Sequence, residues 1–540
     1  MNPENKNTYN FNNQDYDFVF RLYNGVNDVY LTNSAWDDLY LEEDIFDWKI
    51  KGSVIIKSPY ESLERESEEA ISVTKQDKKG LVYKFRNDGR DTLFISIKPK
   101  IQNSDKTNVQ VSDSVWRLEI EAVVYDVEEL DNENYIHKSK KLYFWEKTYQ
   151  MMREKNCYFS TATSGENAGK TSTDQTDNSE RSLQTGVALK YLLSSDETFK
   201  NNSKLTNFDQ TWDNGDNNAR IFYSCADGDK YIDALEYLMY YHVSSKDNGY
   251  LPCILKFERA EKSLDPKQFS LKPISKYFEK AGNKAGQPPK EYQTEHFFIS
   301  EHSGQSKNNV PILKAPLDKK SQKIEFKGNV ITNYRIVDMS GLDYSENLCD
   351  YKTCSFNKID GQFQSEYVFA GKENGGYKKF YKDVISKNIV TTNATDRLPV
   401  TPFIMNNKNM RVLNSVRTTP EARKAESTNI MLKYYLFSNL TISFSVQGST
   451  HRQTGRFFAV SKNTDNTTEF DSKLEGQYFL TNIIHHFSNS SRSYTNELVG
   501  VKTQTYKETT LFSSNDNMIL KNEIQPQNNN ASPVSVQPYA

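Results

Sequence analysis

The sequence predicts a mainly β protein with two antiparallel β domains of the barrel or sandwich type, an inserted α+β module and accessory segments. Three observations support this fold class. Aromatic residues are abundant, with 33 Tyr and 30 Phe among 540 residues, and this composition favours β structure over a Leu- and Ala-rich helical bundle. Apolar and polar residues alternate near both ends of the chain, and helical periodicity is concentrated between residues 180 and 260.

The N-terminal region has the pattern of an antiparallel sheet with one solvated face. Residues 18–23 and 29–31 are rich in aromatic and β-branched side chains and flank Asn24-Gly25, a dipeptide that favours a hairpin turn. From Trp116 to Val124, apolar side chains occupy every second position. A short helix is expected at 146–154, where this domain ends.

Two segments in the middle of the chain place apolar residues at helical spacing. The first includes Leu183, Val187 and Leu192, and the second runs from Ile232 to Met239. Strand-like segments flank the second helix. We therefore expect a small α+β module inserted between β domains.

A long ribbon near the C-terminus, residues 474–505, dominates the last domain. Its two strand segments are joined by the polar turn Ser488–Ser493. Between Tyr478 and Phe487, apolar and β-branched residues fall on both parities, so we interpret the strand as having two apolar faces. We predict that one face packs on its own core and the other on a neighbouring subunit. The candidate residues for this interface with another subunit are Gly476, Tyr478, Phe479, Leu480, Thr481, Ile483, His485, Phe487, Tyr494, Leu498 and Val501.

Taken together, these patterns predict six segments. They are a flexible N-terminus (1–14), an N-terminal β domain (15–155), an α+β middle domain with long polar loops (156–260), an irregular β or connector region (261–428), C-terminal β strands (429–510) and a polar tail (511–540).

Charge and cysteine content limit the classes of function. The chain has 68 Lys and Arg against 71 Asp and Glu, a formal net charge of −3, so no bulk basic surface for nucleic acid is expected. Five scattered cysteines do not form a disulfide framework. The N-terminus has no signal-peptide pattern, and no apolar run approaches the about 18 residues of a membrane helix. We expect a soluble protein, folded in the cytoplasm, that is not membrane-bound.

Sequence patterns that carry catalysis or bind cofactors are weak. The segment Gly165–Thr171 has three residues between its first Gly and the Gly-Lys pair, whereas a phosphate-binding loop needs four. His485 and His486 would point to opposite faces of a strand and could not share one metal ion. We therefore predict no catalytic residues, no metal site and no cofactor. The basic run at 138–147 could bind single-stranded nucleic acid by stacking and charge, but a core strand with solvated lysines is the favoured interpretation.

The ribbon also carries a family resemblance. The pattern Leu474-x-Gly476-x-Tyr478-Phe479-Leu480-Thr481-x-Ile483-x-His485, followed by Phe487, Tyr494, Leu498 and Val501-Lys502, resembles the closing strands of baseplate hub proteins of contractile-tailed bacteriophages. Gly448, Arg452 and Gly455 match the Gly-x-x-x-Arg-x-x-Gly stretch that precedes those strands in the family. Looser matches extend over most of the chain.

The resemblance implies two tail-tube-like domains in one chain and a homotrimeric ring with pseudo-sixfold symmetry. It implies that the ring links the tail tube protein to the central spike protein, contacts neighbouring baseplate proteins, and lets the genome pass through its lumen without specific binding. The expected location is the tail baseplate of the virion, assembled in the host cytoplasm. Two alternatives from other classes remain open, a phage-associated carbohydrate-binding protein and a cell-wall-hydrolysing tail protein.

Overall fold

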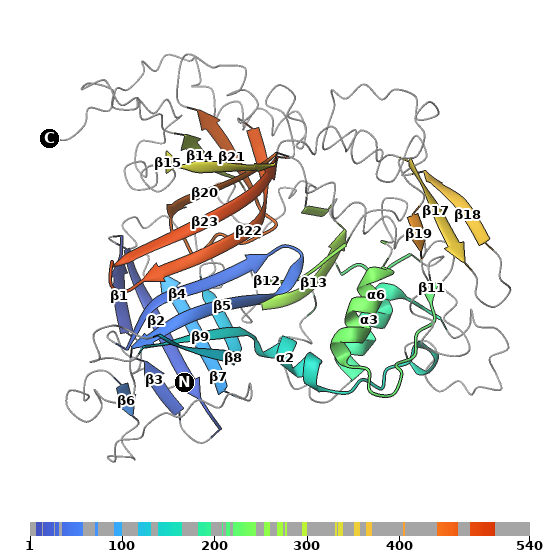
Figure 1. Cartoon of the computed structure of the whole chain (residues 1–540), viewed down its shortest axis with the longest axis horizontal. Helices are drawn as coiled ribbons and strands as arrows, with labels where there is room; N and C mark the ends of the chain where they lie inside the picture. The colour runs from blue at the N-terminus through green and yellow to red at the C-terminus, as the bar shows by residue number, and fades with distance from the viewer. Residues whose placement is uncertain are drawn as a thin grey trace, which may run out of the picture.

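Strands from both ends of the chain join in one large sheet in the computed structural model of the protein (Figure 1). The structure describes residues 7–12, 14–25, 28–31, 35–57, 71–73, 91–99, 117–130, 139–164, 182–195, 208, 212–216, 220–242, 244, 253–259, 267–273, 276–277, 294–299, 330–331, 333–338, 350–356, 363–369, 403–405, 440–462 and 476–502. Within these residues the protein is mainly β, as the composition predicts, and none of the helices has the length and apolar character needed to cross a membrane.

The N-terminal part of the sheet is an antiparallel array in the order β4-β5-β9-β8-β7-β2-β3-β6, with β1 paired to β2. The predicted hairpin is present, since β2 and β3 are antiparallel neighbours and Gly25 has the positive φ of 89° that the turn requires. The strands are β1 (Asn7–Phe11), β2 (Gln14–Tyr23), β3 (Asp28–Leu31), β4 (Trp36–Asp44), β5 (Asp47–Lys57), β6 (Ile71–Val73), β7 (Asp91–Pro99), β8 (Leu118–Leu130) and β9 (Ser139–Glu146).

The expectation of a flexible segment at 1–14 is wrong for the residues that form β1. Tyr9 and Phe11 are each 1% exposed, because their rings pack against the ring of Phe18 at centroid distances of 4.9 and 5.6 Å. Two aromatic side chains on one face give this short strand enough apolar surface to hold it on the sheet.

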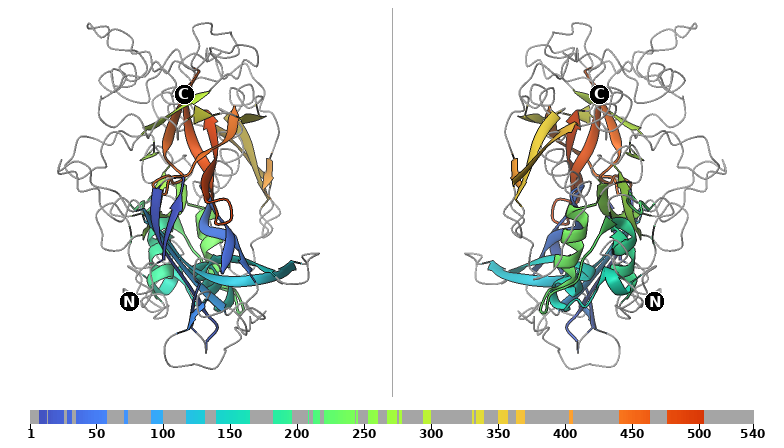
Figure 2. Two further views of the ribbon diagram at one scale, coloured as in Figure 1. Left: turned by 90° about the vertical axis from the view of Figure 1, so that its left-hand side faces the viewer. Right: turned by 90° about the vertical axis from the view of Figure 1, so that its right-hand side faces the viewer.

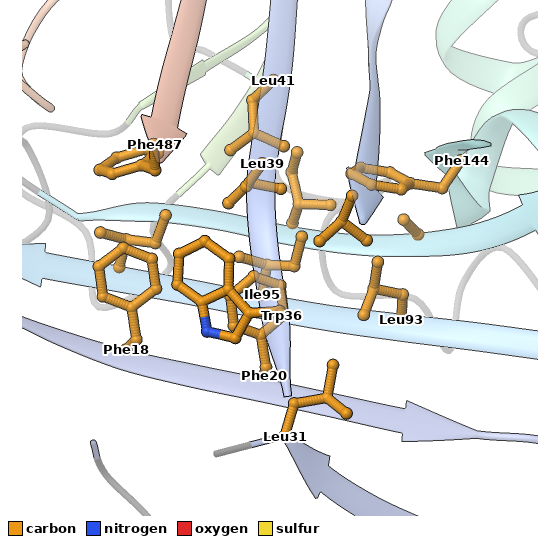
Figure 3. Packing of buried hydrophobic residues seen from close by; sticks show 14 of the residues in the cluster. Phe18, Phe20, Leu31, Trp36, Leu39, Leu41, Leu93, Ile95, Phe144 and Phe487 are labelled. Atoms are coloured by element: carbon orange, nitrogen blue, oxygen red, sulfur yellow. The ribbon is translucent and has the colours of Figure 1, made fainter. Parts of the chain in front are cut away.

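Trp36, at the start of β4, lies in the middle of the N-terminal core (Figure 3). It is fully buried, and its indole Nε1–H donates to the Tyr9 hydroxyl at 2.8 Å. The rings of Phe18 and Phe20 lie 5.6 and 5.1 Å from it between centroids. Figure 3 also shows Phe487, a residue of the C-terminal ribbon, pointing into this core.

The C-terminal part of the sheet encloses a second core, in which Phe297, Phe444 and Phe458 meet edge to face at 5.1 to 5.6 Å. Phe297 comes from the segment predicted as a connector at 261–428, so this region contributes strands to the C-terminal core. The strands are β14 (Thr294–Ile299), β15 (Val330–Ile331), β16 (Tyr334–Asp338), β20 (Thr441–Gln447), β21 (Phe457–Lys462), β22 (Gly476–Ser488) and β23 (Ser493–Lys502).

In the sequence an α+β module lies between the two β regions, and in Figure 1 it lies to their right, drawn mostly in green. Both predicted helices are present in it. Its elements are α2 (Lys147–Glu154), a 3-10 turn (Thr161–Thr163), β10 (Leu183–Gln184), α3 (Thr185–Ser195), β11 (Arg220–Ile221), α6 (Tyr231–Tyr240), β12 (Cys253–Arg259) and β13 (Lys267–Pro273). A separate sheet has the order β18-β17-β19, with β17 (Asp350–Phe356), β18 (Phe363–Phe369) and β19 (Phe403–Met405). The segment Gly165–Thr171 and the tail at 511–540 lie outside the described residues.

Candidate assembly site

β22 is the strand where the two ends of the chain meet. Its residues 482–488 pair antiparallel with β4, and its other edge pairs with β23. Residues 476–479 of the same strand pair with β21. In Figure 1 the red ribbon of β22 and β23 therefore lies directly beside the blue strand β4. The edge of the C-terminal sheet is thus continuous with the edge of the N-terminal sheet.

A β-bulge at Thr481 explains why apolar residues occupy both parities of this strand. Leu480 pairs with Gly500 but Asn482 pairs with Val499, so Thr481 is an extra residue in the ladder. An extra residue moves every later side chain to the other face. The buried series therefore changes from even to odd numbers, and it reads Tyr478, Leu480, Ile483, His485 and Phe487. The interpretation of two apolar faces is therefore wrong for residues 482–487, where only every second side chain is buried, whereas residues 478–481 are buried on both faces.

The buried face of the ribbon contributes to both cores. Tyr478, Leu480, Ile483 and Leu498 belong to the C-terminal core. Phe487 and Tyr494, stacked on each other at 3.8 Å between centroids, belong to the N-terminal core. A single hairpin therefore ties two hydrophobic cores together.

The remaining predicted residues also lie inside the chain's own packing. Phe479 is fully buried on the opposite face, where its ring lies 5.2 Å from Phe457 and 6.0 Å from Tyr277. Val501 pairs with Phe479 across the ladder, and Gly476 pairs with Val460 of β21. Where burial is described, the predicted interface side chains are thus covered within one subunit. Any contact with another copy would have to use other surfaces.

A buried polar network lies between the two cores. His485 Nδ1 is 2.8 Å from the Tyr494 hydroxyl and 2.9 Å from Asn496 Nδ2. The Asn496 side-chain oxygen accepts from Arg452 Nη1 at 2.9 Å, and His485 Nε2 lies 3.8 Å from a carboxylate oxygen of Glu43. Side chains from β4, β22, β23 and the loop after β20 thus share one network. Such a network favours a single relative placement of these elements, because each buried polar group needs its partner.

We expect Tyr494→Phe to lower the free energy of unfolding by about 1–2 kcal/mol, because the variant removes the hydroxyl beside His485 while keeping the ring that stacks on Phe487. Denaturant unfolding followed by circular dichroism measures the change. Tyr158→Phe is the control, since Tyr158 is 80% exposed. Equal unfolding midpoints for Tyr494→Phe and the wild-type protein would contradict a stabilising role for the network.

Between Asn482 and His486 the opposite face of the ribbon is partly exposed, in contrast to the buried face. Ile484 lies between Glu42 of β4 and Glu497 of β23 in the ladder. The His486 ring stacks on Tyr40 at 4.1 Å, and its Nε2 lies 3.1 Å from Asp38. His485 and His486 thus point to opposite faces, as predicted. Hydrogen bonds and stacking within the sheet account for both.

The outer half of β8 forms an exposed edge of the N-terminal sheet. Residues 126–130 pair with β9, and no other described strand pairs with them. Figure 2 shows β8 and β9, in cyan, projecting from the body of the molecule. At the base of this projection Tyr125, 39% exposed, stacks on Trp145 at 3.9 Å between centroids. We call residues 125–130 the β8 edge.

Three potential metal ligands converge in the α+β module. Asp213, His242 and Cys253 are all buried, and their ligand atoms lie within 4.8 Å of one another. Burial lowers the pKa of His242 to about 4, so its imidazole is neutral at pH 7. The sequence gives no sign of this trio, because the three residues follow no ligand spacing and only the fold brings them together.

No protein-family model matches the sequence, and neither does any curated protein. Solved structures similar to this chain include the tail protein from Neisseria meningitidis MC58, with a TM-score of 0.40 and 8% identity over 90% of this chain and 96% of that chain. The 43 kDa tail protein of prophage MuSo2 from Shewanella oneidensis has a TM-score of 0.40 and 9% identity over 90% of this chain and 98% of that chain.

A third similar structure is the E. coli c3393 protein, a type VI secretion component described as structurally similar to the T4 bacteriophage tail proteins gp27 and gp5. Its TM-score is 0.35, with 5% identity over 91% of this chain and 80% of that chain. These neighbours include tail proteins. Likenesses at such TM-scores are too distant to transfer a function.

Proposed function

We propose that this chain is a non-enzymatic structural protein of a contractile tail, a baseplate hub that joins a sixfold tail tube to a central spike as a homotrimeric ring. The observation that carries the proposal is the junction between β22 and β4. It places two β regions with separate cores edge to edge within one chain. The sequence resemblance of the ribbon to the closing strands of hub proteins supports the same function.

The number of sheet units on each side of this junction supports a ring. Two sheet units per chain and three chains give six similar units, which match a sixfold partner on one face and a threefold partner on the other. In this proposal the ribbon residues form the junction inside each chain. A second junction of similar kind must then form between copies to close the ring.

We place the junction between copies at the β8 edge. A strand at the edge of a sheet can pair with a strand of a neighbouring chain, and Tyr125 with Trp145 adds apolar surface next to the β8 edge. The edge also carries Glu128 and Glu129, whose side chains contact Tyr143 and Lys140 of β9 at 2.7 and 3.0 Å. The proposed partners are a second copy at this edge, with tube, spike and neighbouring baseplate proteins on other surfaces.

The experiment that tests the function is electron microscopy of the purified protein combined with light scattering. The proposal expects a ring with threefold symmetry and six similar units, and a mass three times that of one chain at all concentrations above the micromolar range. A monomeric mass across that range would overturn the ring. Binding of the monomer to glycans in an array would favour the carbohydrate-binding alternative instead.

We expect Tyr125→Asp to convert the trimer to monomer, because a buried charge at an apolar contact is costly without a partner. Light scattering measures the mass, and circular dichroism verifies that the fold is retained. Tyr158→Asp, an exposed tyrosine in the α+β module, is the matched control and should remain trimeric. If the Tyr125→Asp variant still had the mass of a trimer, the contact between copies would not lie at the β8 edge.

A further inference from the structure

The buried trio of Asp213, His242 and Cys253 joins three separate parts of the α+β module. Asp213 lies in the loop at 212–216, His242 follows the end of α6, and Cys253 is the first residue of β12. The side chains are 3, 1 and 8% exposed. His242 Nε2 lies 3.8 Å from Asp213 Oδ1, and all three ligand atoms are within 4.8 Å of one another.

Neighbouring groups hold two of these side chains in the orientation of metal ligands. His242 Nδ1 lies 2.7 Å from the Thr185 hydroxyl, so Nε2 is the ring nitrogen that faces the trio. The Ser244 hydroxyl donates to Asp213 Oδ2 at 2.6 Å, and the Gly215 amide donates to Asp213 Oδ1 at 2.8 Å. Metal-binding histidines and carboxylates usually have such outer partners, which orient the ring and the carboxylate.

The loop that carries Asp213 is packed tightly on the N-terminus of α3. Gly215 has a φ of 90°, and a Cβ on Gly186 would lie 2.0 Å from the Asp213 carbonyl oxygen. The Trp212 indole N–H donates to the Gly186 carbonyl at 3.0 Å. These contacts fix the backbone of Asp213 against the N-terminus of α3, and this restricts the position of the Asp213 carboxylate.

We propose that Asp213, His242 and Cys253 bind one Zn²⁺ ion. A carboxylate, an imidazole and a thiolate are all zinc ligands, and the two anionic ligands balance the charge of the dication. A site with zero net charge suits a buried location, because an unbalanced charge there would carry a large desolvation cost.

The distances fit this ion after small movements. Zinc bonds of about 2.1 Å to nitrogen and oxygen at the tetrahedral angle place those two ligands about 3.4 Å apart, close to the 3.8 Å between His242 Nε2 and Asp213 Oδ1. Three protein ligands leave a fourth position for water. The ion would link the loop at 212–216, the end of α6 and the start of β12, and this cross-link would stabilise the module. This inference is independent of the proposed hub function.

The first test measures metal content. Full-length protein, purified without a histidine tag and dialysed in metal-free buffer after incubation with ZnCl₂, should contain about one zinc per chain by mass spectrometry. Removal of zinc with a chelator should lower the unfolding temperature and make Cys253 reactive toward a thiol reagent, and added Zn²⁺ should reverse both changes. A zinc content below about a tenth of an ion per chain would overturn the proposal.

The second test assigns the ligands with Co²⁺ as the probe. Cobalt-loaded wild-type protein should show the near-ultraviolet charge-transfer band of a thiolate ligand, and Cys253→Ser should lose it. The control is Cys225→Ser, because Cys225 and Cys157 have sulfur atoms 2.9 Å apart and form the competing thiol site in the same module. Loss of the band in Cys225→Ser, with its retention in Cys253→Ser, would place the ion on that pair and overturn the assignment.

Discussion

Replacing Trp36 with alanine is expected to lower the free energy of unfolding of the N-terminal core by about 3–5 kcal/mol. The indole is fully buried, and it lies within 5.6 Å, between centroids, of the rings of Tyr9, Phe18 and Phe20. Its removal leaves a large cavity and takes the hydrogen-bond donor from the buried Tyr9 hydroxyl. Denaturant unfolding followed by far-ultraviolet circular dichroism measures the loss, because this signal does not depend on the removed fluorophore.

Tyr191→Ala serves as the control for this substitution. Tyr191 lies on α3 and is 42% exposed, so its removal should change the free energy of unfolding by less than about 0.5 kcal/mol. If Trp36→Ala were as mild as this control, the N-terminal core would not be organised around the indole. The same result would weaken the proposed function, because the N-terminal core belongs to one of the two sheet units from which the proposed ring is built.

Features of the fold that depend on local pattern could be predicted from the sequence. The hairpin at Asn24-Gly25 is one, because a residue that accepts positive φ lies between two apolar segments. Helices α3 and α6 are others, since their apolar stripes follow the helical repeat. In each of these cases the residues that determine the structure are close together in the chain.

Features that depend on contacts between distant segments could not be predicted. The pairing of β22 with β4 joins residues from opposite ends of the chain, and nothing in either strand specifies the other. The burial of β1 follows from Phe18 and Trp36, which the polar start of the chain does not reveal. Asp213, His242 and Cys253 come together through tertiary packing alone. The sequence shows that apolar residues occupy both even and odd positions from Tyr478 to Phe487. Without knowledge of the pairing partner, this pattern predicts two apolar faces as readily as a bulge.

Deleting Thr481 is expected to have the largest effect of all, a loss of more than about 4 kcal/mol in the free energy of unfolding or a failure to fold. The strand then contains no extra residue, so one of its halves must move to the other register. If the later half shifts, Ile483, His485 and Phe487 turn out of the cores. If the earlier half shifts, Tyr478 and Leu480 do. The soluble yield and the denaturation midpoint by circular dichroism measure the effect.

The control for the deletion is Thr481→Ala, which keeps the extra residue and removes one hydroxyl. That hydroxyl donates to the Val499 carbonyl at 3.1 Å, so the substitution should cost about 1 kcal/mol. The difference between the two variants isolates the contribution of the register from that of the side chain. A deletion variant as stable as Thr481→Ala would mean that the ribbon tolerates either register. The junction between β22 and β4 would then have no fixed geometry, and a ring built on that junction could not present six equivalent units to a tail tube.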